Sequence, residues 1–192
     1  MSIGLWVRGA RPKTLVTSIA SVMVGAVMAY VHIERSGTCI AIYPEPASCA
    51  TAREQQTLLM DRFWPVTILC LLVALFLQIA VNYANDYSDG IRGTDAGRDM
   101  DESKSGKPQR LTASGLVPAK HVLFAAMICA AIACICGVVA VVLAQAWWLL
   151  AVGAASLLAG WFYTGGKHPY GYAGFGELSV FLFFGLAAVL GT

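Results

Sequence analysis

The residues from Phe63 to Asn85, FWPVTILCLLVALFLQIAVNYAN, contain no charged side chain. A helix of this length rises about 1.5 Å per residue and can cross the hydrocarbon core of a bilayer, which is about 30 Å thick. Uncharged stretches of the same character recur elsewhere in the chain, at 14–31, 121–166 and 178–192. The pattern predicts an all-α fold in the form of a polytopic bundle of transmembrane helices.

The composition also indicates a membrane protein. The 192 residues are 58% hydrophobic and only 12% charged, and their mean hydropathy is +0.67. Soluble domains usually carry about a quarter charged residues, so the composition excludes one, and it excludes a disordered chain as well. The 13 basic and 11 acidic residues nearly balance, so no nucleic-acid partner is expected.

The lengths of the uncharged stretches set the expected helices. The stretch 121–166 is long enough for two spans, and Gln145, Trp147 and Trp148 near its middle suit a turn at the membrane interface. We therefore expect one membrane domain with about five helices. The predicted segments are helices at about 14–32, 63–85, 121–143, 147–163 and 177–192, an outer loop at 33–62 and a cytoplasmic loop at 86–120.

The distribution of Lys and Arg predicts the orientation. If the N-terminus is cytoplasmic, the inner segments hold ten basic residues and the outer loop holds three. This asymmetry predicts a cytoplasmic N-terminus. A signal peptide at 14–31 fits less well, because the apolar run is long and further spans follow it. The stretch 178–192 is too short to cross the bilayer, so we expect the sequence to be the N-terminal portion of a larger protein.

The six cysteines fall into two groups. Four lie inside predicted helices, where they behave as small apolar residues: Cys70, Cys129, Cys134 and Cys136. Cys39 and Cys49 lie in the predicted outer loop. A disulfide between them is compatible with an oxidising outer compartment, but spacing alone does not decide whether it forms.

Polar side chains gather where the second predicted helix meets the cytoplasm. Four of them are spaced by three or four residues, so they share or adjoin one helix face: Asn82, Asn85, Asp86 and Asp89. Solvation of a helix end explains the two amides poorly, because Asn82 in particular lies one turn deeper, where an unpaired amide is costly. Grouped oxygen donors suit Mg²⁺, which takes one or two carboxylates and completes its shell with water and phosphate.

Cations follow in the same loop and again after the fourth predicted helix. Lys107 and Arg110 share the membrane face of the acidic cluster and could bind a diphosphate that Mg²⁺ also bridges. Lys167 is the only Lys or Arg after Lys120, so it does not serve the overall charge bias. Its glycine-rich surroundings can approach a phosphate closely, and its ammonium adds a point charge. The adjacent His168 fits a solvated imidazole better than a catalytic base.

Several motifs together resemble the UbiA-type membrane prenyltransferases, and most of all their 1,4-dihydroxy-2-naphthoate branch, which makes menaquinone. The motifs that carry this resemblance are residues 11–15, 82–95, 110–115, Tyr163 with Lys167, and 176–185. The resemblance covers nearly the whole sequence apart from the outer loop. It implies nine transmembrane helices around a cavity open to the cytoplasm and to lipid. It also implies two Asp-rich motifs that bind a prenyl diphosphate through Mg²⁺.

The resemblance implies a role for each polar position. The implied catalytic residues are Asp86, Asp89, Lys167 and Tyr163. The implied metal ligands are Asp86, Asp89 and Asn85. The implied substrate-binding residues are Asn82, Asn85, Arg110, Lys107, Arg11 and Lys13. Gly93 stands where many members carry a further Asp, and the second Asp-rich motif belongs to a half of the fold that this chain lacks. Residues 1–192 alone are therefore expected to be a poor catalyst.

The implied reaction is Mg²⁺-dependent transfer of a polyprenyl group from a polyprenyl diphosphate to 1,4-dihydroxy-2-naphthoate. A CDP-alcohol phosphotransferase is an alternative, because its signature also begins Asp-x-x-Asp-Gly, as at 86–90, but Gly93 and Thr94 replace the expected Ala-Arg pair. A membrane transporter or scaffold is a second alternative, which is disfavoured because Gly and polar residues gather at helix ends on one side. An inactive remnant is the third alternative.

Overall fold

The computed structural model describes residues 3–37, 46–93, 110–164, 170 and 174–192. All regular structure in these ranges is helical, which confirms the all-α prediction. The elements are α1 (Ile3–Gly9), α2 (Pro12–Ser36), α3 (Pro46–Arg92), α5 (Ala119–Ala144), α6 (Leu149–Thr164), α7 (Gly176–Val180), the π-helix η2 (Phe181–Ala187) and α8 (Ala188–Leu190). Three of them, α2, α3 and α5, are long and apolar enough to cross a membrane.

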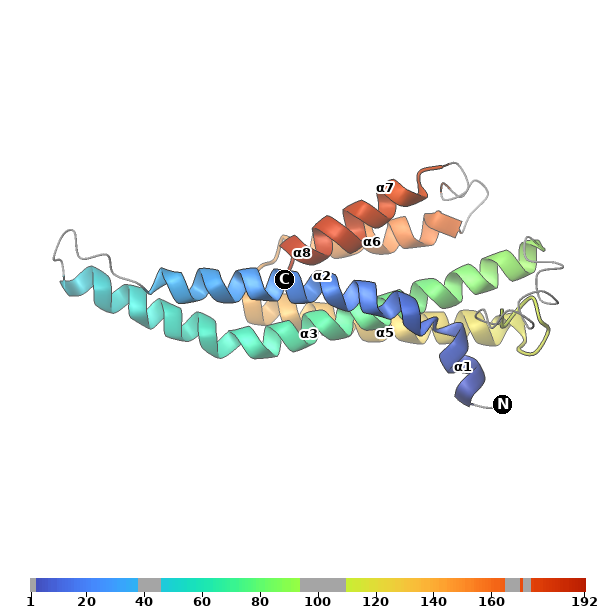
Figure 1. The fold of residues 1–192 in the computed structure, drawn as a ribbon, viewed down its shortest axis with the longest axis horizontal. Coiled ribbons are helices and arrows are strands. Elements are labelled where there is room, and N and C mark those ends of the chain that lie inside the picture. Colours follow the sequence, from blue (N-terminus) through green and yellow to red (C-terminus); the bar gives the residue numbers. More distant parts are fainter. Residues whose placement is uncertain (1–2, 38–45, 94–109, 165–169, 171–173) are drawn as a thin grey trace.

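The helices form an elongated bundle in which α3 is the central element (Figure 1). α3 packs most extensively against α5, and α2 lies against α3 as well. α6 runs beside the consecutive α7, η2 and α8 (Figure 1), and α8 contacts α2. Gly25 permits that last contact, because a Cβ atom there would lie 2.5 Å from the carbonyl oxygen of Val189.

α3 is longer than the membrane requires. It has 47 residues, which corresponds to about 70 Å at about 1.5 Å per residue. The predicted outer loop is therefore wrong over 46–62, and the predicted cytoplasmic loop is wrong over 86–92, because both stretches are helical. An uncharged stretch marks only the part of a helix that lies in lipid. Ala, Arg, Glu, Gln and Leu also favour helix in water, so a helix rich in them continues beyond the uncharged stretch. α3 also contains Pro65 and is visibly bent (Figure 1), as expected where a proline removes a helix hydrogen bond.

The last apolar segment differs from the single helix predicted at 177–192. The structure divides it into α7, the seven-residue π-helix η2 and α8. A π-helix closes its hydrogen bonds over five residues, and such turns are frequent at functional sites. Side chains on the two sides of η2 therefore do not keep the 3.6-residue spacing of a continuous α-helix.

The cysteines of the described residues also fall into two states. Cys49 is disulfide-bonded, whereas the four cysteines of the predicted helices carry free thiols. Cys39 lies outside the described residues, so a pairing of Cys39 with Cys49 stays a prediction.

A sharp elbow at Arg11 separates α1 from α2. Arg11 has φ 52° and ψ 69°, a left-handed conformation that costs a non-glycine residue about 1–2 kcal/mol. Pro12 is the first residue of α2 and disfavours the helical conformation for the residue before it. The elbow is tied to α3, because the hydroxyl of Tyr83 donates a hydrogen bond to the carbonyl oxygen of Trp6 at 2.9 Å.

A small core lies beneath the elbow and joins α1, α3, α5 and the chain between α3 and α5. Its buried residues are Ala10, Tyr83, Leu111, Val117, Val122 and Ala126. Leu111 is completely buried and lies directly against Gly9, where an added Cβ would come within 2.6 Å of its Cδ1. The core therefore depends on the absence of a side chain at Gly9.

Gly9→Val is expected to destabilise the protein by about 1–3 kcal/mol, because the new side chain would have to displace Leu111, which is completely buried. Gly4→Val is the matched control on the same helix, since no atom lies within 4 Å of a Cβ at Gly4. Thermal unfolding of both variants in detergent measures the difference. Equal midpoints for the two variants would contradict the close packing of Gly9 on Leu111.

Candidate functional site

The polar end of α3 brings four of the predicted site residues together. All four lie in the last turns of one continuous helix: Asn82, Asn85, Asp86 and Asp89. Asn82 and Asp86 are only 3% and 2% exposed, whereas Asn85 and Asp89 are half-buried. The four residues therefore divide into two that are enclosed by protein and two that remain accessible.

Asn82 holds the elbow between α1 and α2. Its Nδ2 donates hydrogen bonds to the carbonyl oxygen of Ala10 at 2.8 Å and to the hydroxyl of Thr14 at 2.9 Å. The Thr14 hydroxyl in turn donates to the carbonyl oxygen of Arg11 at 2.9 Å. Both N–H groups of this deeply placed amide are thereby satisfied, which removes the cost of its burial.

Gln78 extends the polar chain one turn deeper along α3. Its Nε2 donates to Oδ1 of Asn82 at 3.3 Å, and its Oε1 accepts a hydrogen bond from the hydroxyl of Ser18 at 2.8 Å. The sequence analysis did not single out Gln78 or Ser18. The signal for Gln78 was its position four residues before Asn82 within an uncharged stretch, where a polar amide needs a partner.

Asp86 is bonded to the chain that follows α3. Its Oδ2 accepts a hydrogen bond from the backbone N–H of Leu111 at 2.8 Å, and its Oδ1 accepts one from the N–H of Thr112 at 2.9 Å. A charged acceptor makes each of these bonds stronger than one between neutral groups. Asp86 therefore fixes the backbone at 111–112 on the side of α3.

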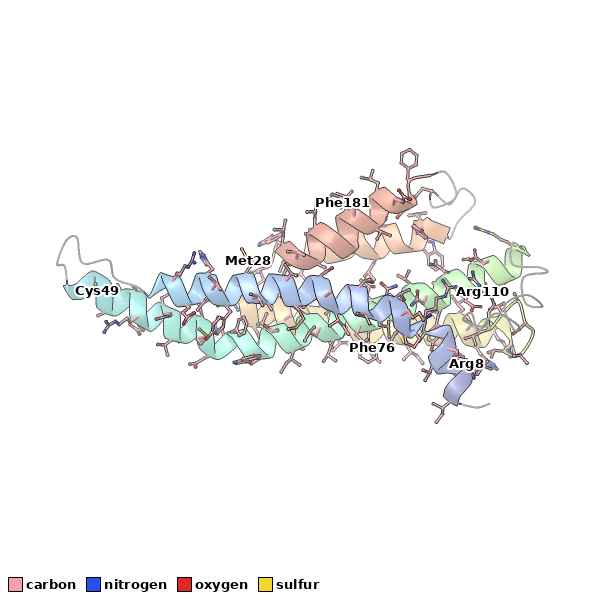
Figure 2. The ribbon with its side chains drawn as sticks, in the orientation of Figure 1. Arg8, Met28, Cys49, Phe76, Arg110 and Phe181 are labelled. Atoms are coloured by element: carbon pink, nitrogen blue, oxygen red, sulfur yellow. The ribbon has the colours of Figure 1, made fainter. Side chains whose placement is uncertain are left out.

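Asp89 lies one turn further along and faces Arg110. A guanidinium nitrogen of Arg110 lies 3.7 Å from a carboxylate oxygen of Asp89, and the two side chains are 16% and 18% exposed. The structure thus brings together the two predicted residues of opposite charge, one from α3 and one from the chain before α5. Figure 2 shows Arg110 at the same end of the bundle as Arg8, and Cys49 at the opposite end.

The basic residues of the N-terminal segment differ in exposure. Lys13 is exposed on the first turn of α2, and Arg11 is half-buried at the elbow. The elbow that carries Arg11 is held by Asn82, so the N-terminal segment and the polar end of α3 are directly bonded. Lys107 and Lys167, with His168, lie outside the described residues, and their meeting with the carboxylates stays a prediction.

A cavity of about 840 Å³ begins beside this polar end and extends between the helices. Its polar lining includes Asn82 and Asn85 from α3 and Tyr163 from α6. The rest of its wall is mainly apolar and comes from α2, α3, α5, α6 and the segment from α7 to α8. Tyr163, predicted to belong to the site, therefore shares one hollow with the two amides.

Tyr170 is a site-adjacent residue that sequence reasoning missed. Its ring packs edge-on against Tyr163 with the centroids 5.7 Å apart, and it also lines the cavity. Its hydroxyl donates to the carbonyl oxygen of Ala159 and lies 2.8 Å from the hydroxyl of Ser179. Tyr170 thereby links α6 to α7. No feature of the sequence around Tyr170 specified this link, which depends on contacts between two helices.

The oxygen donors at the end of α3 fit Mg²⁺ by type. The amide of Asn85 and the carboxylate of Asp89 lie one turn apart, and each oxygen of Asp86 retains a lone pair beyond the one used by a backbone N–H. The hydroxyl oxygen of Thr112 beside them is buried without a hydrogen-bond partner. Among the described residues no group of three His, Cys, Asp or Glu could hold a metal ion. Water and phosphate oxygens would therefore have to complete the shell.

Comparison with known proteins places these residues in one family. The chain matches the model of the UbiA prenyltransferase family over residues 57–192. A relative from Mycobacterium tuberculosis, named 1,4-dihydroxy-2-naphthoate octaprenyltransferase, is 44% identical, and the match covers 100% of this chain and 53% of the relative. Relatives of the same name from Escherichia coli and Bacillus subtilis are 30% and 28% identical. Those matches cover 97% and 88% of this chain, and 52% and 43% of the relatives.

The chain thus spans about half the length of the curated relatives it matches. No solved structure matches it. The family match begins within α3 and includes Asn82, Asp86, Asp89, Arg110 and Tyr163.

Proposed function

Because the chain belongs to the UbiA prenyltransferase family, we propose that it takes part in transferring a polyprenyl group from a polyprenyl diphosphate to 1,4-dihydroxy-2-naphthoate, a step of menaquinone biosynthesis. One observation carries this proposal: Asn82 and Asn85, at the polar end of α3, border the same large, mainly apolar cavity as Tyr163. A prenyl diphosphate needs such surroundings, because its head is charged and its tail is apolar. The names of the relatives support the naphthoate acceptor.

The residues at the polar end of α3 would receive the diphosphate. Asn85 and Asp89 would hold Mg²⁺, which when bound neutralises the diphosphate and makes it a better leaving group. Asp86, the third residue predicted as a ligand, accepts backbone N–H bonds from Leu111 and Thr112. Arg110 would donate to a diphosphate oxygen from its position beside Asp89. Further positive charge is proposed to come from four residues: Arg11, Lys13, Lys107 and Lys167.

The apolar wall of the cavity would protect the reacting carbon. The carbon–oxygen bond of the prenyl diphosphate breaks and leaves an allylic cation, which water would capture if it were present. A ring carbon of the naphthoate then forms the new carbon–carbon bond, with loss of carbon dioxide and a proton. The cavity of about 840 Å³ would hold the isoprenoid chain while the polar end of α3 holds the diphosphate, with Tyr163 lining the same hollow.

We assign the polar end of α3 to the cytoplasmic face of a bacterial inner membrane. The three long apolar helices support a membrane location. The excess of Lys and Arg in the segments beside this end supports the cytoplasmic assignment. The family match favours prenyl transfer over the phosphotransferase and transporter alternatives.

The test is a transfer assay in membranes that contain a full-length protein carrying residues 1–192 unchanged, since the chain spans only about half of its relatives. Prenyl diphosphates of several lengths are supplied with dihydroxynaphthoate. Prenylated naphthoate is expected with Mg²⁺, and chelation with EDTA is expected to lower the rate at least about 10²-fold, because the metal carries several kcal/mol of charge stabilisation. Excess Mg²⁺ should restore it.

Two outcomes would contradict this proposal. Prenyl transfer that continues unchanged in EDTA would exclude a requirement for Mg²⁺. Absence of product with every prenyl diphosphate would exclude the activity and favour an inactive remnant. Omission of the dihydroxynaphthoate is the control for hydrolysis of the diphosphate alone.

A further inference from the structure

The chain just before α5 is fixed to α3 by a buried carboxylate. The two N–H bonds that Leu111 and Thr112 donate to Asp86 measure 2.8 and 2.9 Å. Asp86 is 2% exposed and Leu111 is completely buried. The bond from Leu111 is buried and the bond from Thr112 is partly buried, so loss of the carboxylate would leave the enclosed N–H of Leu111 without an acceptor.

Two glycines allow the backbone to come this close. A Cβ atom at Gly90 would collide with the side chain of Thr112 and lie 3.3 Å from the backbone nitrogen of Ala113. A Cβ atom at Gly9, on α1, would collide with the side chain of Leu111. The residues 110–113, which we call the Arg110 turn, are thus confined between α3 and α1.

The confinement of this turn determines where Arg110 lies. Arg110 directly precedes Leu111, whose N–H group is held by Asp86. Its guanidinium then lies 3.7 Å from Asp89, one turn of α3 beyond Asp86. The distance between Arg110 and Asp89 therefore depends on the hydrogen bond between the N–H of Leu111 and Asp86, in which neither Arg110 nor Asp89 takes part.

We propose that Asp86 is a positioning residue, which seats the Arg110 turn on α3 and so holds the guanidinium of Arg110 beside Asp89. The proposal rests on the proposed function, because the value of this placement is a cation and a carboxylate ready for the diphosphate and its metal. It gives Asp86 and Asp89 different tasks, although the sequence presents them as equivalent members of one acidic motif. Asp86 acts through the backbone, and Asp89 acts at the accessible surface.

The first test measures amide hydrogen exchange of the full-length protein in lipid nanodiscs, without metal or substrate. Asp86→Ala is expected to speed exchange at Leu111 and Thr112 by about tenfold or more, since each loses its acceptor. Asp86→Asn is expected to have a smaller effect, because its amide oxygen still accepts one N–H. Asp89→Asn is expected to leave both amides as protected as in the unchanged protein. Exchange that rises over all helices alike would indicate general destabilisation and overturn the proposal.

The second test is a double-substitution cycle on the Michaelis constant for the prenyl diphosphate. Asp86→Asn and Arg110→Met are each expected to raise KM about tenfold, and the double variant is expected to be no worse than Arg110→Met, because Asp86 acts through Arg110. Additive effects would overturn the proposal.

Mn²⁺ binding, measured by electron paramagnetic resonance, distinguishes the roles of the two carboxylates. The affinity for Mn²⁺ is expected to fall in Asp89→Asn and to change less than about threefold in Asp86→Asn. An equal fall in both variants would make Asp86 a direct ligand and overturn the proposal.

Gly90→Ala provides a variant that keeps the carboxylate. It displaces the Arg110 turn through Thr112, so it is expected to raise exchange at 111–112 and to raise KM in the same way as Asp86→Asn. If the Asp86 variants do not fold, Gly90→Ala replaces them in the test. Unchanged amide exchange at residues 111–112 in Gly90→Ala would then refute the proposal. Exchange and Mn²⁺ binding require no turnover. If no prenyl transfer is found, the proposed function fails. The exchange and Mn²⁺ measurements still show whether Asp86 positions the Arg110 turn.

Discussion

Asp89→Asn is expected to lower the rate of prenyl transfer about 10³-fold, a loss of about 4 kcal/mol of transition-state stabilisation. Asp89 is the accessible carboxylate at the polar end of α3, and its partner Arg110 lies at 3.7 Å. Removing its charge would weaken the hold on Mg²⁺ and remove the negative charge that Asp89 places beside the Arg110 guanidinium. The measurement is product formation by the full-length protein at saturating prenyl diphosphate and Mg²⁺.

The matched control is Asp61→Asn. Asp61 is an exposed carboxylate on the same helix, nearer its other end and away from Arg110 and the polar end of α3. The same substitution there is expected to leave transfer within about twofold of the unchanged protein, as for surface positions in general. Turnover of Asp89→Asn equal to that of Asp61→Asn would remove Asp89 from the site.

Gly153→Phe is expected to lower kcat/KM for long prenyl diphosphates by about 10- to 100-fold, while short ones are affected less. Gly153 lines the cavity from α6, and no atom lies within 4 Å of a Cβ placed there. The first carbon of a side chain at Gly153 therefore meets no neighbour, and a phenylalanine ring there is expected to occupy part of the hollow. The measurement is kcat/KM across a series of prenyl diphosphates of increasing length.

Ala155→Phe is the control for Gly153→Phe. Ala155 is exposed on the same helix but does not line the cavity, so all chain lengths should react as before. An equal loss for short and long substrates in Gly153→Phe would mean that the cavity does not hold the isoprenoid tail.

The membrane helices were predictable because their signal is local. The predicted segments 14–32, 63–85 and 121–143 all lie within α2, α3 and α5. Each residue in them contributes its own transfer free energy, so composition alone identifies a span. The full length of α3 was not predictable in this way, because its polar half is stabilised as helix without being apolar.

The site was predictable only in part. The spacing of Asn82, Asn85, Asp86 and Asp89 along one helix is a sequence property, and the structure places all four at one helix end. Their division into enclosed and accessible residues is not a sequence property. Asp86 is bonded to backbone N–H groups 25 and 26 residues away, and every non-proline residue carries such a group. Only the folded chain determines which N–H groups Asp86 binds.

The length of α3 has a further consequence for experiments in sealed vesicles. Cys49 lies near its first residue and Asp89 near its last, about 60 Å apart along the axis at about 1.5 Å per residue. This exceeds the thickness of the hydrocarbon core, which is about 30 Å. We therefore predict that the disulfide and the polar end of α3 face separate aqueous compartments. A membrane-impermeant reductant and a membrane-impermeant chelator, added from one side, should each reach only one of them, so sidedness can be measured with the unmodified protein.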